Sequence, residues 1–347
     1  MTIKPQILLI YTGGTIGMIK DYTTGALKAF DFDQILQKIP ELQHLNCKID
    51  TVSFDEPIDS SNMNTDYYVK IASIIEENYT KFDGFVVLTG SDTMSYTSSA
   101  ISFLLENLQK PVIFTGSQLP IGDLRTDAKE NLITSIEIAS SRKKDTPIIT
   151  EVCLYFEYKL YRANRTTKIN AAQFEAFTSL NYPPLAESGV HLTFNYHLLH
   201  TLKNTSKELI VRKSLDTNVT ILKLFPGITA AVVRSVINIP NLKGMVLETY
   251  GAGNAPTEKW FIKLLKEAEN KGIKIINITQ CIGGSVLLGH YETSMYLKKI
   301  GIIDGKDMTT EAAVAKLMYL LGEQLPTKQF KAFFERSLRG EMTIETT

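Results

Sequence analysis

The sequence predicts an α/β protein with two domains: a larger N-terminal domain on a doubly wound, mostly parallel sheet, and a smaller C-terminal α/β domain. Short apolar runs typical of buried strands alternate with helix-like segments as far as residue 156. The same rhythm starts again after a polar, non-periodic stretch at 181–213. We therefore expect an N-terminal domain over 1–190, a linker over 191–212 and a C-terminal domain over 213–347.

Apolar runs mark four expected strands of the N-terminal domain, at 7–11, 84–88, 111–116 and 147–156, and an alternation of apolar and polar residues at 47–54 marks a fifth, half-buried strand. The expected helices lie near 32–38, at 64–79, and in the segments that end at about 108 and 140. Asn64 is a good N-cap for the second of these helices, because its side chain can accept hydrogen bonds from the first turn. Since strand and helix alternate, neighbouring strands are expected to be parallel.

The C-terminal domain repeats this pattern. Its expected strands lie at 219–224, 244–250 and 272–279, and its helices start at 226–229 and about 257, with three more near 291–300, 310–322 and 327–337. The segment 251–256 superficially matches a dinucleotide-binding fingerprint, but Pro256 stands where the third glycine is needed. We therefore expect no nicotinamide site and no cofactor.

Composition excludes several classes of partner. Lysine plus arginine equals aspartate plus glutamate, at 37 each, so we expect neither nucleic-acid binding nor a basic membrane-binding surface. The N-terminus lacks a signal-peptide pattern, and the three cysteines are scattered and odd in number, which indicates reduced thiols in a cytoplasmic protein. His191, His197 and His200 have no cysteine or aspartate ligands nearby, so we expect no metal site.

Three segments that follow expected strands carry hydroxyl groups, at Thr15, at Ser60 and Ser61, and at Ser91 beside Asp92. Two of these segments also contain glycine, which allows the chain to turn sharply. In an open parallel sheet, ligands bind beyond the carboxyl ends of the strands, so these side chains are candidates for a common site. The same residue types also serve as helix caps and turn formers, which is the structural alternative.

The segment 160–168 adds three cations, Arg162, Arg165 and Lys168. Such a cluster usually forms a solvated face, but a lysine beside a hydroxyl and an acid could carry a proton in catalysis. A hydroxyl needs such a base to act as a nucleophile, and N–H groups of a glycine-rich turn can stabilise an oxyanion. The sequence has no phosphate-binding loop, G-x-S-x-G elbow, H-E-x-x-H or paired C-x-x-C motif. Hydroxyls, one acid and a lysine therefore indicate metal-free acyl transfer on a small polar substrate.

Several motifs resemble those of the bacterial type I (cytoplasmic) L-asparaginases. They are TGGTIGM at 12–18, DSSNM at 59–63, TGSDTM at 89–94, TGSQLP at 115–120, LYRANRTTK at 160–168, YGAGNAP at 250–256, TQC at 279–281, and LRGEMT near the C-terminus. The resemblance covers essentially the whole chain, in order, and the first and third motifs are specific when they occur together. It implies a larger N-terminal and a smaller C-terminal α/β domain, and hydrolysis of L-asparagine to L-aspartate and ammonia through an acyl-enzyme.

The resemblance also implies roles for individual residues. Thr15 matches the nucleophile, and Ser91, Asp92 and Lys168 match a second hydroxyl–acid–lysine set. Ser60, with Ser61 beside it, and Asp92 match the residues that hold the α-carboxylate and α-ammonium groups of the substrate.

Members of this family place their sites at an intimate dimer interface, and tetramers formed from two such dimers are common. By this resemblance, Asn254 is expected to reach into the site of a neighbouring subunit. The substrate and a second copy of the chain are the partners that we expect.

The chain departs from the family pattern at three places. Ser91 replaces a threonine and Thr89 a histidine, but the hydroxyl of Ser91 is kept, so we expect activity to survive. The tyrosine that the family carries in the lid falls near Ala26, and Tyr22 is the nearest substitute. Glu248 stands where some members have an arginine at a second, regulatory asparagine site, and its charge is expected to repel the carboxylate of such an effector.

Three other functions are compatible with these residues. One is a glutaminase-asparaginase of broader specificity, and another is the D subunit of a tRNA-dependent amidotransferase, for which an extra N-terminal domain is expected. The third is a non-catalytic amino-acid-binding protein of the same fold, but the intact set of hydroxyls, acid and lysine argues against it.

Overall fold

The computed structural model describes residues 4–20, 27–29, 39–200, 207–290 and 292–344. The chain divides into two units, Met1–Lys213 and Ser214–Thr347. The expected helix at 32–38, together with Tyr22 and Ala26, lies outside the described residues.

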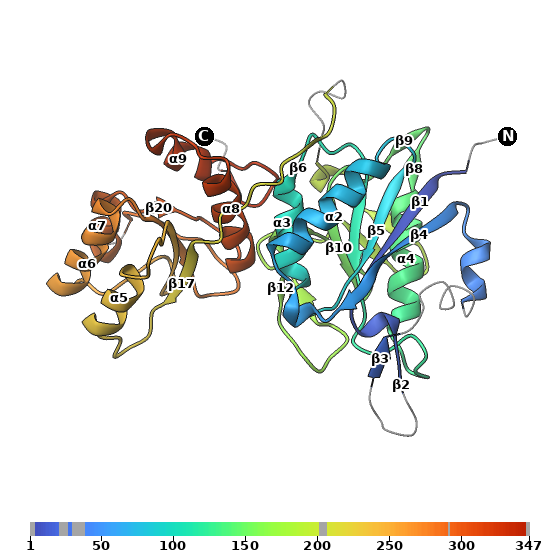
Figure 1. The fold of residues 1–347 in the computed structure, drawn as a ribbon, viewed down its shortest axis with the longest axis horizontal. Coiled ribbons are helices and arrows are strands. Elements are labelled where there is room, and N and C mark those ends of the chain that lie inside the picture. Colours follow the sequence, from blue (N-terminus) through green and yellow to red (C-terminus); the bar gives the residue numbers. More distant parts are fainter. Residues whose placement is uncertain (1–3, 21–26, 30–38, 201–206, 291, 345–347) are drawn as a thin grey trace. The chain divides into compact units, whose positions relative to one another are not determined.

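The first unit is organised around one sheet of eight strands (Figure 1). Five of them are parallel neighbours, in the order β10 (Val152–Phe156), β7 (Val112–Thr115), β5 (Gly84–Leu88), β1 (Gln6–Gly13) and β4 (Lys48–Ile58). Three antiparallel strands extend the sheet beyond β10, namely β11 (Lys159–Arg162), β14 (Ala186–Ser188) and β15 (Leu192–Phe194). The mostly parallel sheet that the sequence predicts is confirmed.

Two of the sequence expectations differ in detail from the observed strands. The run expected as a strand over 147–156 is regular only from residue 152, after a two-residue strand β9 (Thr146–Pro147). The stretch 191–212, which we expected to be a linker, contains β15 and also β16 (Ile210–Val211), which pairs with β6 (Leu105–Glu106). Both pairings tie this stretch to the first unit.

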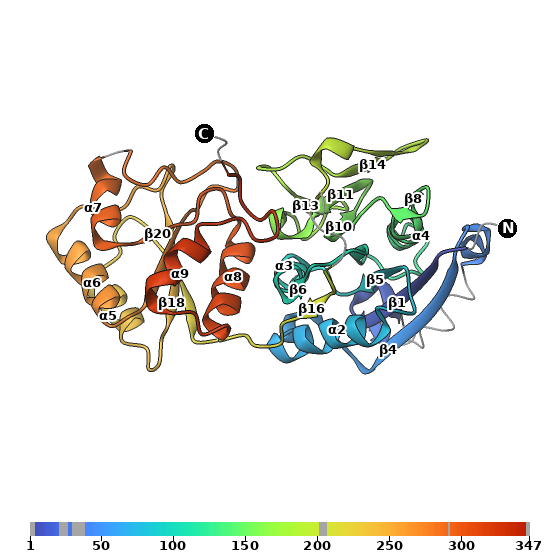
Figure 2. The same ribbon diagram turned by 90° about the horizontal axis from the view of Figure 1, so that it is seen from above.

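Helices cover both faces of the sheet in the first unit (Figure 2). Helices α2 (Thr65–Asn78) and α3 (Met94–Leu104) pack on one face, and α4 (Ala128–Ser140) packs on the other. Asn64 caps α2, with its side-chain oxygen accepting hydrogen bonds from the N–H groups of Asp66 and Tyr67. Because β5, β7 and β10 follow one another in a single direction, α3 and α4 on opposite faces require crossovers of opposite hand, which is rare.

Short elements make up the remaining regular structure of the first unit. They are η1 (Thr15–Gly17), β2 (Met18–Lys20), β3 (Leu27–Ala29), η2 (Pro40–His44), η3 (Ser60–Asn62), β8 (Arg142–Lys143), η4 (Ala163–Arg165), β12 (Thr167–Lys168), β13 (Phe177–Thr178) and η5 (Tyr196–Leu198). Elements η1, η3 and β12 carry residues that the sequence singles out as functional.

The second unit contains a parallel sheet of four strands, β17 (Val219–Lys223), β18 (Gly244–Thr249), β19 (Lys274–Thr279) and β20 (Ile303–Asp304). Its helices are α5 (Ala230–Ile237), α6 (Lys259–Asn270), α7 (Glu292–Ile300), α8 (Thr310–Gly322) and α9 (Thr327–Phe334). The core between sheet and helices includes Phe261, Leu264 and Leu265, which are almost fully buried. The second series of alternating strands and helices, which the sequence predicts, is confirmed.

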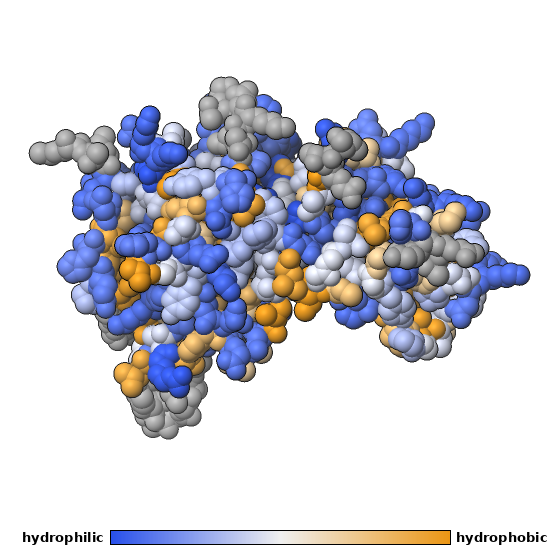
Figure 3. Space-filling view, turned by 180° about the vertical axis from the view of Figure 1, so that it is seen from behind, coloured by the Kyte–Doolittle hydropathy of each residue, from blue (hydrophilic) through white to orange (hydrophobic). Residues whose placement is uncertain are grey.

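Figure 3 shows hydrophobic residues in small groups among hydrophilic ones over the face that it presents. No helix in the part of the chain that the structure describes is long and apolar enough to cross a bilayer.

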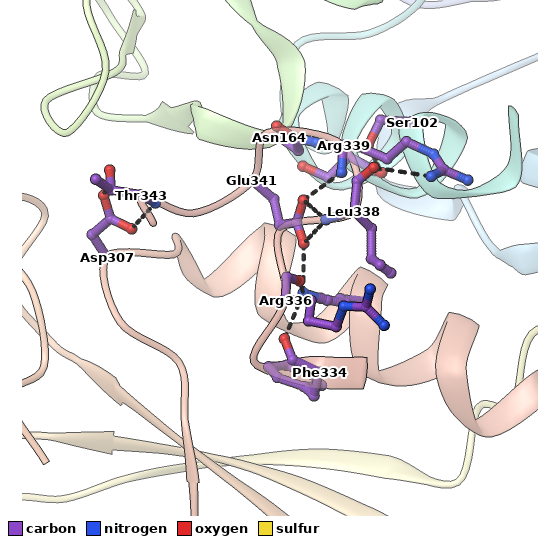
Figure 4. A network of polar contacts seen from close by, with 11 residues as sticks. Ser102, Asn164, Asp307, Phe334, Arg336, Leu338, Arg339, Glu341 and Thr343 are labelled. Atoms are coloured by element: carbon purple, nitrogen blue, oxygen red, sulfur yellow. Dashed lines mark hydrogen bonds and ion pairs between the residues drawn. The ribbon is translucent and has the colours of Figure 1, made fainter. Parts of the chain in front are cut away.

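A buried ion pair fastens the C-terminal segment of the second unit to α8. Lys316 and Glu341 are both fully buried, and Lys316 Nζ donates hydrogen bonds to Glu341 and to the backbone carbonyls of Phe334 and Arg336. The Glu341 carboxylate also accepts the backbone N–H groups of Leu338 and Arg339, as Figure 4 shows. The carboxylate thus organises the loop that follows α9.

Candidate active site

The turn after β1 packs backbone against backbone on two other segments. Gly13 has φ 131° and Gly14 φ 87°, values that only glycine adopts without strain. A Cβ atom on Gly13 would lie 2.1 Å from the carbonyl oxygen of Ile58, and one on Gly14 would lie 2.4 Å from the backbone nitrogen of Gly90. The two glycines therefore let the Thr15 turn approach both the Ser60 segment and the Ser91 segment.

The Ser60 and Ser91 segments also touch each other directly. A Cβ atom on Gly90 would lie 2.5 Å from Ser60 Oγ, and Thr93 Oγ1 donates a 2.8 Å hydrogen bond to the carbonyl oxygen of Ser60. Ser60 itself is buried. The three hydroxyl-bearing segments, far apart in the sequence, therefore converge at the carboxyl ends of β1, β4 and β5.

Lys168 links this cluster to an acid. Its Nζ lies 2.8 Å from Ser91 Oγ and 2.7 Å from Asp92 Oδ1, distances typical of charge-assisted hydrogen bonds. The lysine side chain is 16% exposed, whereas that of Asp92 is 68% exposed. Lys168 therefore points into the cluster, and Asp92 faces solvent where a substrate could reach it.

The other two cations near Lys168 do not form the solvated face that their spacing suggested. Arg162 and Arg165 are buried, and Arg162 forms an ion pair with Glu151. Burial opposes the charge of Arg162, but the Glu151 carboxylate outweighs it and raises the pKa of the guanidinium. The clustering in the sequence is misleading because the buried partner, Glu151, precedes β10 and lies outside the motif.

Gln118 is a member of the cluster that the sequence reasoning missed. Ser91 Oγ donates a 3.1 Å hydrogen bond to Gln118 Oε1, and Gln118 Nε2 donates a 3.0 Å bond to the carbonyl oxygen of Gln173. Gln118 follows β7, in a third turn that starts with Thr-Gly. The repeated Thr-Gly dipeptide could have identified Gln118 as a site residue. It marks a turn at the end of β7, and β7 is the parallel neighbour of β5.

The threonines that open these turns mostly connect strands. Thr12 Oγ1 donates to the carbonyl oxygen of Leu88, and Thr115 Oγ1 to that of Tyr155. Thr89 is also buried, but its hydroxyl has no hydrogen-bond partner among the residues that the structure describes. It contributes no proton donor or acceptor to the cluster.

Tyr11 lies directly below the Thr15 turn, since a Cβ atom on Gly17 would fall 2.0 Å from its hydroxyl oxygen. Burial raises the pKa of Tyr11 to about 12, so its phenol stays neutral at physiological pH. Tyr11 is therefore not a base of this cluster.

Two residues predicted to bind substrate are placed differently from Ser60. Ser61 is exposed, and both its N–H and its hydroxyl donate 2.8 Å hydrogen bonds to Asp59 Oδ1. These hydrogen bonds lower the pKa of Asp59 and close the turn of η3, as the structural alternative for this serine expects. Asn254 belongs to the second unit, in a tight turn after β18 that bridges to Tyr250. It is not among the residues that the first unit brings together.

Replacing Gly90 with alanine is expected to raise the KM for substrate between about 10-fold and 100-fold, because the new methyl group displaces Ser60, and displacements of about 1 Å have such effects. Steady-state kinetics measures the change. Gly122→Ala is the matched control, since a Cβ atom there has open space within 4 Å. Equal KM values for the two variants would show that the close approach of Gly90 to Ser60 does not affect substrate binding.

Comparisons with known proteins match both units. A family model described as the N-terminal domain of asparaginase matches residues 6–200. A second, described as the glutaminase/asparaginase C-terminal domain, matches residues 218–334. The chain belongs to the asparaginase family.

Individual relatives agree with this assignment to the asparaginase family. The chain is 41% identical over 343 residues to L-asparaginase 1 of Escherichia coli (strain K12), covering 98% of each protein. It is 40% identical to the 60 kDa lysophospholipase of Mus musculus, of which it covers 63%. The crystal structure of L-asparaginase I from Vibrio cholerae superimposes with a TM-score of 0.89 at 39% identity, covering 98% of this chain and all of that one.

Glu248, where this asparaginase-family chain departs from the pattern, is a buried acid with two partners. Thr310 Oγ1 donates a 2.6 Å hydrogen bond to Glu248 Oε1, and Lys223 Nζ lies 3.3 Å from Glu248 Oε2. No group of three or more side chains suited to hold a metal ion is found among the described residues.

Proposed function

We propose that the protein is an amidohydrolase that converts L-asparagine to L-aspartate and ammonia. The observation that carries the proposal is the convergence of Thr15, Ser60 and the Ser91–Asp92 pair, with Lys168 bonded to both members of that pair. Family membership supports this reaction, and the close relatives named above include two L-asparaginases.

In the proposed mechanism, the Thr15 hydroxyl oxygen attacks the side-chain amide carbon of asparagine. Ser91 Oγ takes up the proton of Thr15 as the Lys168 amine takes the proton of Ser91, and N–H groups of the glycine-rich turns stabilise the oxyanion. The intermediate collapses by breaking the C–N bond, and the nitrogen takes up the proton and leaves as ammonia. Water then attacks the ester on Thr15, which restores the threonine hydroxyl and releases aspartate.

Recognition of a zwitterion fits the charges of the cluster. The exposed carboxylate of Asp92 is placed to hold the α-ammonium group, and the buried hydroxyl of Ser60 to hold the α-carboxylate. Asp92 therefore has two tasks in the proposal, since it also holds Lys168. Ser61 stands beside this substrate site, although its own hydroxyl is bonded to Asp59.

We further propose that Asn254 completes the site from a neighbouring subunit, in an intimate dimer that pairs into a tetramer. The turn that carries Asn254 is closed by two backbone hydrogen bonds between Asn254 and Tyr250, of 2.8 and 2.9 Å, which support a fixed position for a residue presented to a partner. Scattered, unpaired thiols support a cytoplasmic location.

Ammonia release from L-asparagine and from L-glutamine tests the proposed function. We expect rapid release from asparagine and at least about 10-fold less from glutamine, because one extra methylene in a fitted site costs about that much. Equal rates on the two substrates would instead indicate the broader glutaminase-asparaginase. Binding of aspartate without any ammonia release would indicate the binding protein.

A further inference from the structure

We infer that Asp127 is a positioning residue for catalysis, which fixes Gln118 so that Gln118 holds the Ser91 side chain with its oxygen beside Lys168. This inference rests on the proposed function, because it assigns a task to the Ser91–Lys168 pair. It extends the site by two residues that lie outside the set predicted from the sequence.

The Asp127 carboxylate is the anchor of the turn that carries Gln118. Its oxygens accept the backbone N–H of Gln118, at 2.9 and 3.2 Å, and the backbone N–H of Leu119, at 3.1 Å. Asn131, one turn further along α4, donates 3.0 Å and 3.3 Å hydrogen bonds from Nδ2 to the Gly116 carbonyl and to Asp127 Oδ2. The turn at 116–119 is thus held by side chains at the start of α4 rather than by strand pairing.

These donors oppose the effect of burial on the Asp127 carboxyl group. Burial raises the pKa of Asp127, and the hydrogen bonds from Gln118 and Leu119 act against that shift. A neutral amide in the same place offers one acceptor oxygen and turns an NH₂ group toward backbone N–H donors. The Asp127→Asn substitution therefore releases the turn with almost no change in side-chain size.

The orientation of the Gln118 amide follows from its two partners. Its NH₂ group faces the carbonyl oxygen of Gln173, so its carbonyl oxygen must face Ser91. Before the reaction, Ser91 donates to Gln118, and its oxygen accepts from Lys168 Nζ at 2.8 Å. A shift of the turn removes the acceptor that holds Ser91 in this rotamer, and the Ser91 oxygen can then move away from Lys168.

A double-mutant cycle separates positioning from general loss of structure. Asp127→Asn, Gln118→Leu and the double variant are compared with the wild type by steady-state ammonia release from L-asparagine. We expect Asp127→Asn to lower kcat about 10-fold, as loss of hydrogen bonds to a charged group typically does. KM is expected to change less than about 3-fold, because Ser60 and Asp92 are untouched. The double variant is expected to match Gln118→Leu alone.

Asp123→Asn is the matched control, since Asp123 lies in the same loop and its side chain makes no hydrogen bond or ion pair to another described residue. It should retain the wild-type kcat. Losses that multiply in the double variant, or an unchanged kcat in Asp127→Asn, would overturn the inference, because Asp127 would then not act through Gln118.

A second readout keeps this inference distinct from the proposed function. A diazoketone analogue of asparagine labels an activated nucleophile without turnover, and mass spectrometry gives the labelling rate. A wild type that releases no ammonia contradicts the proposed function, whereas the ratio of labelling rates among the variants still tests the positioning. A wild type that is neither active nor labelled overturns both.

Discussion

Replacing Thr15 with alanine is expected to lower asparagine turnover by about 10⁴-fold or more, because the reaction then lacks its nucleophile. Ser91 cannot readily substitute, since its oxygen is engaged by Lys168 and its proton by Gln118. The Thr15 side chain makes no hydrogen bond to any other residue that the structure describes, so the melting temperature should hardly change. Ammonia release and differential scanning calorimetry measure the two quantities.

Thr15→Ser is the control for this experiment, since it keeps a hydroxyl in the same turn. We expect it to retain measurable turnover, although the smaller side chain lacks the methyl group that restricts its rotamer. If Thr15→Ala kept a tenth of the wild-type rate, the nucleophile would have to lie elsewhere in the cluster.

Replacing Lys316 with methionine is expected to lower the free energy of unfolding by about 3–5 kcal/mol, the usual cost of leaving a buried charge without its partner. The methionine fills a similar volume, but Glu341 loses its cation, and the carbonyls of Phe334 and Arg336 lose their donor. Urea unfolding at pH 7 measures the loss. Because Figure 4 shows the Glu341 carboxylate bonded to the loop after α9, the loop should loosen too.

The cost of Lys316→Met is expected to shrink as the pH falls. Burial by itself would raise the pKa of Glu341, but in the wild type the Lys316 charge and the hydrogen bonds to the carboxylate lower it overall. The wild type therefore loses stability as the pH falls through the lowered pKa, below the usual value of about 4.3. The variant loses the charge and hydrogen bond of Lys316 but keeps burial and the backbone N–H donors of Leu338 and Arg339, so the pKa of Glu341 is higher in the variant than in the wild type and protonation costs the variant less stability.

Lys243→Met is the matched control for that experiment. Lys243 also forms a lysine–carboxylate pair in the second unit, with Asp216, but its side chain is 54% exposed. Because solvent screens the Lys243 charge, we expect a loss clearly smaller than that of Lys316→Met, although the Asp216 side chain is only 13% exposed. Burial alone would raise the pKa of Asp216, but its hydrogen bonds, including that from Lys243, lower the pKa overall, so a weak pH dependence is expected. Comparable losses for the two lysine variants would mean that burial of the Lys316 pair does not govern its energetics.

Local patterns in the sequence were sufficient to predict the long parallel strands and the helix that starts after Asn64. Apolar runs of strand length predicted β1, β5, β7, β18 and β19, because these strands are buried on both faces and need no alternation. The strand β17 was also predicted, although it is only partly buried. The N-cap at Asn64 was also readable, since a cap depends on neighbours within one turn. Gly13 and Gly14 marked a turn whose backbone geometry only glycine adopts.

The antiparallel half of the first sheet was not predicted. Strands β11, β14 and β15 are short and irregularly spaced, and β15 lies in the polar stretch that we expected to be a linker. Their stability comes from pairing along the edge of an existing sheet rather than from their own composition. The periodicity of the sequence therefore gives little indication of which short strands pair at the edge of the sheet.

By itself, the sequence determined the alternation of strands and helices, the glycine turns, and the hydroxyls, acid and lysine that the proposal uses. Only the tertiary structure decided which side chains meet. The bond of Gln118 to Ser91 joins two turns that a crossover brings together. The pairing of Arg162 with Glu151 depends instead on the β10–β11 hairpin, and the hold of Asp127 on the Gln118 turn depends on the fold of the loop before α4. The physical reason is that a polar side chain carries no periodic signal, and its partner depends on how strands and loops pack.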